Sequence, residues 1–389
     1  VGLNDIDNTV EAGINDATIN AAQKVDVIAV SGGTQVAAGI GATLTTDASS
    51  GKNYSGAGSA SVNLIDKNVK AGLKDTNVSG TETVKTDLDI AAYESDVQVT
   101  GGVSMSIATG GGKVAGGAVT VANINNNVNS FIDGGEYKNI GTTKVQSLLA
   151  TTQVTAAIAT GIAVGGSGNN MAFEGAVVYN GLTNNVQAGI TGAELTSDNV
   201  NVIAKDVAAS DAEAEAYQKL LGSYSDNQTF AAEHDVAVDG KAYYADLDTS
   251  STEVTSAEIN EDAEYDGQSA VNLKNTGKTG STIVGAALVV AGSDNAAGAA
   301  VNIANINNNF NHFKADIEQS TIVAENMQVG ADADTLLINV AGGVAAGKDK
   351  FGGMGSVSWQ TLNNDVTAQV AHSDVTVDEL AVRADNSSL

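Results

Sequence analysis

Paired carboxylates are the side chains in this sequence that come closest to a catalytic arrangement. Glu261 with Asp266, and Asp206 with Asp211, are spaced as acid pairs, and two carboxylates that flank a glycosidic bond can hydrolyse it. The chain has 46 acidic and only 18 basic residues, so composition alone produces such pairs. A site for acidic polysaccharides also needs basic residues beside the substrate carboxylate, and few are present. We therefore expect no catalytic residues and a protein that is not an enzyme, with a polysaccharide-acting enzyme as the third reading.

Metal-binding side chains are scattered. The three histidines, His234, His312 and His372, show no ligand or triad spacing and are expected on the solvated surface. The absence of Cys excludes disulfides and thiolate metal sites. Acidic residues within 258–266 are the candidates for a peripheral Ca²⁺ ion. No cofactor is expected, and the residues of any metal site stay unassigned.

Two glycine-rich segments, GGSGNN at 165–170 and AGSDNAAG at 291–298, resemble phosphate-binding loops only in their glycines. Neither ends in Lys-Ser or Lys-Thr, and neither stands between a strand and a helix. The nonapeptide repeat of stacked calcium sites is also missing. The sequence therefore favours neither a phosphate-binding loop nor a roll of stacked calcium sites.

Asparagine clusters at 125–127 and 307–309 allow two interpretations. They could form side-chain amide ladders or left-handed turns, or they could form a polar surface for a ligand. We favour the structural interpretation because both clusters occupy one position of a repeat. Trp359 and Tyr179 each precede a repeat-marker leucine by three positions, which favours packing on a strand face.

The elements that must carry these side chains are strands of a repeat. Apolar residues two apart, separated by steps rich in Thr, Ser, Asp, Asn and Gly, are typical of strands between tight turns. The segments 121–131 (VANINNNVNSF) and 303–313 (IANINNNFNHF) are nearly identical. Apolar markers recur at nearly equal steps, except for one step of double length, at Ile6, Ile65, Ile124, Leu182, Ile306 and Leu362. The double step predicts a degraded copy between Leu182 and Ile306, with 238–244 as its candidate.

Each repeat holds three apolar stretches of roughly 20 residues, a size that suits one coil of a parallel β-helix. We therefore expect three coils per repeat and about 19 coils, which would make a rod on the order of 90 Å long. Residues 1–206 and 283–389 are predicted to be regular β-solenoid repeats. Residues 207–282 are predicted to be a degenerate, acidic, Tyr-rich repeat within one continuous rod. Side chains expected to point inward include Val186, Ala188, Ile190, Val200 and Val202.

The degenerate repeat is the best candidate for a partner-facing surface. Residues 207–266 carry 15 acidic and 2 basic residues and five of the nine tyrosines, and exposed Tyr is common in recognition patches. Its segment 211–217 (DAEAEAY) alternates Ala with acids and predicts a strand with outward acids. A longer loop is expected at 222–227.

Composition agrees with a thin core and a soluble, acidic protein. Apolar residues are 42% of the chain but aromatic residues only 4%. The chain has no Pro, where average usage would give roughly 19, and this favours strands paired on both sides. A net charge of −28 repels nucleic acid and anionic lipid. No apolar run approaches the length of a membrane-spanning helix, so we expect no direct membrane insertion.

Segments such as GGAVTVANINNNV (116–128) and EGAVVYNGLTNNVQAGITGAELTSDNVNVIAKD (174–206) resemble the repeats of large filamentous adhesins. These are the leukotoxin-like and filamentous-haemagglutinin-like passengers of type V secretion in Gram-negative bacteria. The resemblance covers most of the chain, but weakly over 207–282. It implies a right-handed parallel β-helix, exported unfolded to the cell surface, and the lack of Cys suits that route. No secretion-signal domain or translocation barrel accompanies the repeats.

The sequence thus predicts an all-β, right-handed parallel β-solenoid that acts as an extracellular adhesive or structural stalk. Its expected partners are a host or bacterial surface receptor or a glycan. The alternative is a self-assembling filament or sheath subunit that stacks end to end.

Overall fold

The computed structural model describes residues 1–20, 23–46, 53–165, 170–208, 214–217, 219, 280–306 and 312–388. These residues are almost entirely β-strand, and their fifteen strands join one sheet with parallel pairings only, so the expected all-β, parallel fold is confirmed. The strands are β1 (Gly2–Asn15), β2 (Thr18–Asn20), β3 (Lys24–Thr45), β4 (Asn53–Lys74), β5 (Asn77–Ser79), β6 (Thr86–Thr109), β7 (Gly112–Asp133), β8 (Glu136–Val164), β9 (Met171–Thr191), β10 (Glu194–Asp206), β11 (Ser281–Ile306), β12 (His312–Glu318), β13 (Thr321–Leu362), β14 (Asp365–Ala371) and β15 (Asp374–Ser388). Among the described residues no helix is long and apolar enough to cross a membrane.

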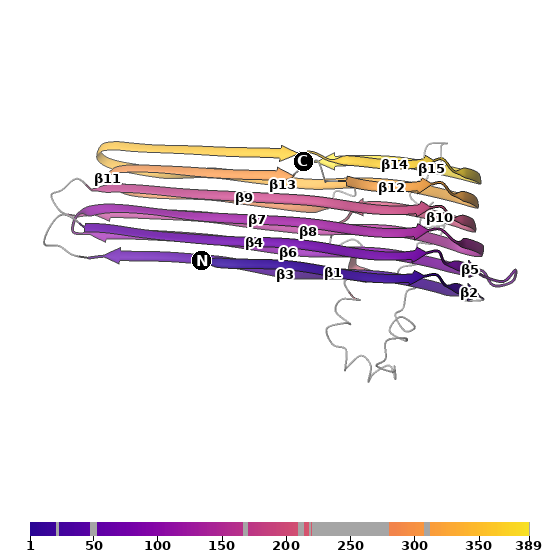
Figure 1. The fold of residues 1–389 in the computed structure, drawn as a ribbon. Helices are drawn as coiled ribbons and strands as arrows, with labels where there is room; N and C mark the ends of the chain where they lie inside the picture. Colours follow the sequence, from indigo (N-terminus) through magenta and orange to yellow (C-terminus); the bar gives the residue numbers. More distant parts are fainter. Residues whose placement is uncertain are drawn as a thin grey trace, which may run out of the picture.

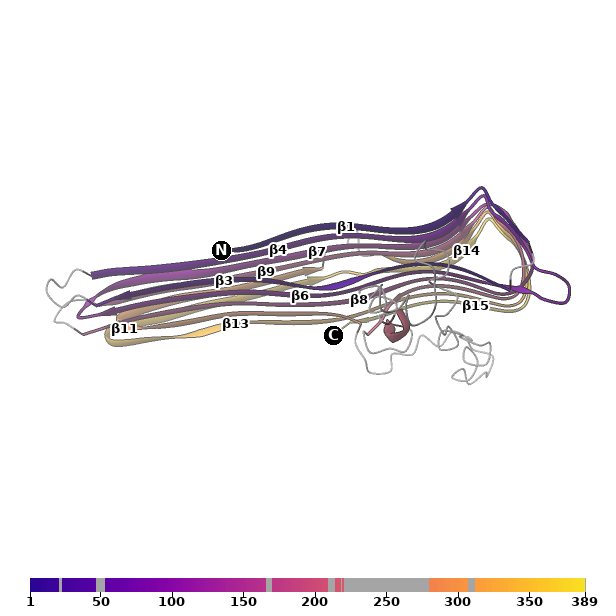
Figure 2. The same ribbon diagram turned by 90° about the horizontal axis from the view of Figure 1, so that it is seen from below.

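Each repeat contributes one rung to a stack of two layers (Figures 1 and 2). The first layer contains β1, β4, β7, β9, the end of β11 with β12, and the end of β13 with β14. The second layer contains β3, β6, β8, β10 with the start of β11, the start of β13, and β15. Short corner segments such as β2 and β5 join the layers at one end.

The expectation of three coils per repeat is wrong. Asn53 of β4 pairs with Gly112 of β7, a whole repeat later, and no partners a third of a repeat apart occur in the described sheet. The cause is that the Val-x-Val-x-Ala stretch and the Gly/Ala-rich stretch lie on the same long strand, for example within β6, without a turn between them. Six rungs at the usual spacing make a stack roughly 29 Å high, far shorter than the expected rod, and the long dimension of the molecule runs along the strands (Figure 1).

The marker residues stack as expected. Ile6, Ile65, Ile124, Leu182, Ile306 and Leu362 are successive register partners in the first layer. The inward positions predicted in the fourth repeat are confirmed too, because Val186, Ala188, Ile190, Val200 and Val202 are all fully buried.

The space between the layers narrows away from the corner (Figure 2). Near the corner it holds large side chains, such as Leu73, Ile90 and Phe313. In the narrow half it holds mainly Ala, as at Ala118 and Ala157. The low aromatic content of the sequence therefore matches the thin interior.

No described strand separates the rungs on either side of the double step between Leu182 and Ile306. β9 pairs directly with β11 and β12, and β10 pairs directly with β13. Asp206 ends β10 and Ser281 begins β11, and their side chains are hydrogen-bonded at 3.0 Å, so the chain leaves and rejoins one strand position. The proposed degraded copy at 238–244 and the loop at 222–227 lie outside the described residues.

The predicted strand at 211–217 is not formed by its described part. Residues 214–217 make a helical turn whose Ala214 and Tyr217 pack on the outer surface of the second layer, with the Tyr217 ring stacked on Tyr93 at a centroid distance of 5.4 Å. The free energy gained by burying Ala214 and Tyr217 thus outweighs the preference for a strand that the alternation of Ala with acidic residues indicates.

The corner of each rung has a residue with positive φ, and in every rung before the last its backbone N–H continues the hydrogen-bond ladder to the next rung. We expect Gly192→Ala, at φ 63°, to lower the free energy of unfolding by about 1–2 kcal/mol, because an L side chain is disfavoured there. A steric clash with neighbouring atoms is not the reason, since the nearest atom to an added Cβ is 3.9 Å away. Urea unfolding measures the change. Gly175→Ala, with similar space and no positive φ, is the matched control, and an equal loss in both variants would contradict the backbone argument.

Candidate functional site

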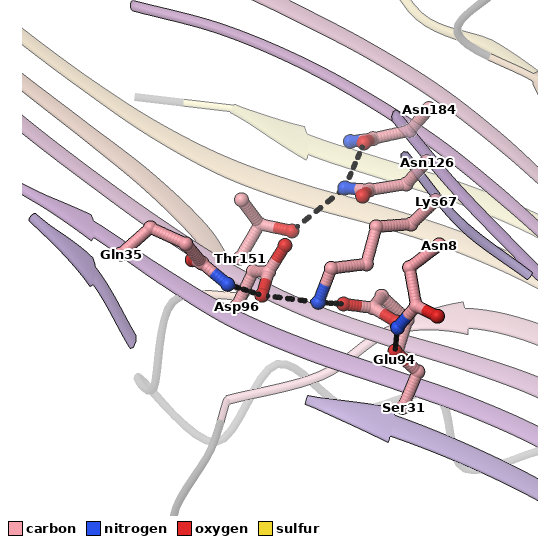
Figure 3. A network of polar contacts seen from close by, with 9 residues as sticks. All are labelled: Asn8, Ser31, Gln35, Lys67, Glu94, Asp96, Asn126, Thr151 and Asn184. Carbon is pink, nitrogen blue, oxygen red and sulfur yellow. Dashed lines mark hydrogen bonds and ion pairs between the residues drawn. The ribbon is translucent and has the colours of Figure 1, made fainter. Parts of the chain in front are cut away.

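A buried ion cluster lies between the two layers (Figure 3). Lys67 comes from β4 in the first layer, and its Nζ is 3.0 Å from Glu94 Oε1 and 2.7 Å from Asp96 Oδ1. Both acids belong to β6 in the second layer. The three side chains are at most 2% exposed, so Lys67 joins the layers electrostatically and is shielded from molecules in solution.

Burial and the neighbouring charges set the protonation of this cluster. Burial raises the pKa of Glu94 to about 7, opposed by Lys67 and reinforced by Asp96. Burial also acts to lower the pKa of Lys67, but the two acids overcome it and the net shift is upward. The lysine is therefore firmly charged, and Glu94 holds a proton more tightly than a free carboxyl group does.

Uncharged polar side chains extend the cluster along the stack (Figure 3). The Asn126 Nδ2 group donates to Thr151 Oγ1 at 3.0 Å and to Asn184 Oδ1 at 3.1 Å. Gln35 donates to Asp96 at 3.2 Å on the other side. Side-chain hydrogen bonds in the interior thus connect neighbouring rungs as well as the two layers.

Sequence reasoning missed this cluster because charged residues were expected to point outward. The alternation of inward and outward side chains along the strands does identify these residues. Lys67 lies between the inward residues Ile65 and Val69 of β4, at a position that also points inward. Glu94 and Asp96 follow Ala92 at the inward positions of β6. Side-chain parity along a strand therefore identifies these buried charges.

The outer surface of the first layer has a polar hollow above this cluster, with a volume of about 500 Å³. We call it the asparagine groove. One wall is a column of register partners, Asp7, Asp66, Asn125 and Thr183, and the other is the column Asn68, Asn127 and Asn185. These side chains flank the inward-pointing column that contains Lys67, Asn126 and Asn184.

One wall of the asparagine groove is an amide ladder and the other contains an amide–carboxylate hydrogen bond, so the structural interpretation of 125–127 is confirmed. Asn185 donates to Asn127 Oδ1 at 2.9 Å, Asn127 donates to Asn68 Oδ1 at 2.8 Å, and Asn125 donates to Asp66 Oδ1 at 2.7 Å. A left-handed turn is not formed, since all three residues of 125–127 lie within β7. A primary amide has two N–H donors and two acceptor lone pairs, so a ladder that uses one of each leaves the others for a ligand. The cluster at 307–309 lies outside the described residues.

The other sequence candidates do not meet at one place. Asp206 is 1% exposed and bonded to Ser281, and burial raises its pKa well above the usual value. His312 Nδ1 is 3.0 Å from Asp365 Oδ2 on the surface, whereas His372 lies at the corner and its side chain is 78% exposed. Tyr179 and Trp359 occupy one outward column, as expected. Asp211, His234, Glu261, Asp266 and the Ca²⁺ candidates in 258–266 lie outside the described residues, and the described ones contain no group of acids and histidines suited to a metal ion.

The two glycine-rich segments come together at the end of the molecule opposite the corner. Asn170 Oδ1 accepts the Gly112 N–H at 2.8 Å, and its Nδ2 donates to Asp294 at 3.0 Å. These contacts join successive rungs, and in the described part of the chain the next element after each segment is a strand, with Asp294 itself lying in β11.

The fold and site thus define a protein of stacked parallel strands with a polar outer groove over a buried ion cluster. Comparison with known proteins finds no family model, no curated protein and no solved structure that matches the chain.

Proposed function

We propose that the stacked rungs are a right-handed parallel β-solenoid that serves as an extracellular adhesive stalk, and that the asparagine groove is its glycan-binding surface. The observation that carries the proposal is the ladder of Asn68, Asn127 and Asn185 on the outer face of the first layer, which faces the hydrogen-bonded pair Asn125 and Asp66. Amides and carboxylates repeat there at the strand spacing of about 4.8 Å, and they offer donors and acceptors to the hydroxyl groups of an extended carbohydrate.

The resemblance to type V secreted adhesin repeats supports an extracellular setting, and the lack of Cys suits export of an unfolded chain because no disulfide can block its passage. A rigid stack also suits display, because side chains on regular strands keep their geometry without a separate loop scaffold. Lys67 strengthens this rigidity, since its ion pairs connect the floor of the asparagine groove to the second layer.

An array of neutral and acidic oligosaccharides tests the proposal, followed by calorimetry with the best-bound member. We expect Asn127→Ala to weaken binding by about tenfold or more, because it removes two hydrogen bonds of the ladder and one amide from the wall. The matched control is Asn129→Ala, two positions along the same strand and also outward, but outside the asparagine groove. Binding that is unchanged in Asn127→Ala, or absent from the whole array, would refute glycan recognition by this groove.

A further inference from the structure

The outer surface of the second layer, in the narrow half of the molecule, has no charged side chain on its described strands. The outward residues come from β3, β6, β8, the start of β11 and the middle of β13. We call them the uncharged face: Thr34, Val36, Ala38, Ile40, Ala42 and Leu44; Val97, Val99, Gly101, Val103, Met105 and Ile107; Thr152, Val154, Ala156, Ile158, Thr160 and Ile162; Thr282, Val284, Ala286, Leu288, Val290 and Gly292; Leu336, Ile338, Val340, Gly342, Val344 and Ala346. The whole chain has a net charge of −28, so the exclusion of charge from this face is marked.

The uncharged face is far larger than the apolar patches that soluble monomers expose. Five strands about 4.8 Å apart and six outward positions about 6.6 Å apart give a flat area on the order of 1,000 Å². The largest patch on a typical monomer is about 300–600 Å², whereas a stable interface buries about 800 Å² on each partner. The uncharged face is thus the size of one side of a complete interface.

Its relief is self-complementary over its first four strands. The column Val36, Val99, Val154 and Val284 forms a ridge, and the column Ile40, Val103, Ile158 and Leu288 forms another. Between them runs a furrow of small residues, Ala38, Gly101, Ala156 and Ala286. In the fifth strand, Val340 and Gly342 reverse this order. A ridge of branched side chains fits such a furrow on a facing sheet, which is how packed sheets interdigitate about 10 Å apart.

The neighbouring part of the same surface is already covered. Val207, Ala214 and Tyr217 pack over Ile28, Ala91, Tyr93 and Leu148, so the chain buries the apolar outer surface of the second layer where it has residues to do so.

We propose that the uncharged face packs against the same face of a second copy of this chain, related by a two-fold axis. An isologous contact pairs ridges with furrows reciprocally. The asparagine groove lies on the first layer and stays open in both copies, so the pair would present two grooves, but the pairing does not depend on what the groove binds. Salt should strengthen the pair, because it screens repulsion between two acidic chains while leaving the uncharged contact intact.

Sedimentation velocity over a concentration series from the micromolar range upward tests the pairing. We expect the parent to reach twice the chain mass of 39.0 kDa, and Val103→Glu to weaken the dimer by about tenfold or more because a carboxylate would be buried in the contact. Val119→Glu is the matched control on the first layer, since Val103 is 40% exposed and Val119 is 42% exposed. At concentrations where the parent is a single chain, both variants should melt like the parent, because each glutamate then faces water.

A second measurement does not depend on a destabilising change. The chain has no Cys, so Ala156→Cys in the furrow should cross-link in pairs with a flexible bis-maleimide, while Ala115→Cys on the first layer should not. The proposal is overturned if the parent keeps the mass of one chain at every concentration. It is also overturned if a dimer forms that Val103→Glu does not weaken and that cannot be cross-linked through position 156. Association of more than two chains that Val103→Glu leaves unchanged would also overturn the proposal, because it would show that the chains pair through the exposed edges of the first and last rungs. Binding of one-chain parent to phosphatidylcholine vesicles, lost in Val103→Glu, would assign the face to lipid.

Discussion

Replacing Lys67 by methionine is expected to lower the free energy of unfolding by about 3–5 kcal/mol at pH 7. The substitution keeps the volume of the side chain but removes the cation that lies 3.0 Å from Glu94 Oε1 and 2.7 Å from Asp96 Oδ1. Two carboxyl groups with almost no solvent exposure would then face each other without a counter-charge, and either the charge or the proton they take up has to be accommodated in a dry interior. Denaturant unfolding followed by circular dichroism measures the loss.

A triple variant tests whether the loss of stability in Lys67→Met is caused by the missing positive charge. Adding Glu94→Gln and Asp96→Asn to Lys67→Met should recover most of the lost stability, because a neutral cluster needs no cation. Lys70→Met is the matched control: its Nζ is 3.7 Å from Glu11 at the surface, and exposed ion pairs contribute about 0–1 kcal/mol. A Lys67→Met variant within about 1 kcal/mol of the parent would show that the buried ion cluster does not hold the layers together.

The protein is expected to become more stable as the pH falls from about 7 towards 4.5, against the usual trend for acidic proteins. Glu174 is 5% exposed, neither of its oxygens has a hydrogen-bond partner among the described residues, and burial raises its pKa to about 7. A carboxyl group whose folded pKa lies above its unfolded value near 4.5 is held protonated by the fold. Stability is therefore lost as the pH rises from about 4.5 through 7, by about 2–3 kcal/mol for this group, and regained on acidification.

Glu174→Gln tests this expectation, because it removes the titration while keeping the shape of the side chain. The variant should match the parent near pH 5 and exceed it by about 2 kcal/mol at pH 8. Burial raises the pKa of Glu94 and of Asp332 to about 7 as well, so Glu174→Gln should flatten the profile only in part. Glu194→Gln, at an exposed position, is the control that should leave the profile unchanged. A parent whose melting temperature falls steadily below pH 7 would contradict the assignment.

Repeat period and side-chain parity could be predicted from the sequence, but the number of coils could not. The marker column from Ile6 to Leu362 and the inward series from Val186 to Val202 follow from spacing alone. Coil number depends on where a strand turns. In the narrow half, both faces of a strand carry small or apolar residues, as in the Gly/Ala-rich part of β8, so the pattern there does not distinguish a continuing strand from a turn.

Only the asparagine ladder of the candidate site, and not the buried ion cluster, could be predicted from the sequence. The amide ladder at 125–127 follows from asparagines at one repeat position. The pairing of Lys67 with Glu94 and Asp96 depends on which rungs and layers face each other, and that requires the true coil length of one whole repeat. With three coils per repeat, β4 and β6 would not have been placed opposite one another.

The spacing of paired residues also dictates the order in which this chain can acquire its structure. In the described sheet, partners on successive rungs lie at least a whole repeat apart along the chain, as for Lys24 with Asp87 and for Thr321 with Asp374. The first contact between rungs must close a large loop before any pairing compensates for the lost chain entropy, so initiation should be slow. Once two rungs are joined, their free edge is a template of N–H and C=O groups for the next repeat, and growth proceeds by addition at that edge. A chain that emerges from one end during synthesis or export would therefore assemble in the direction in which it emerges, rung upon rung.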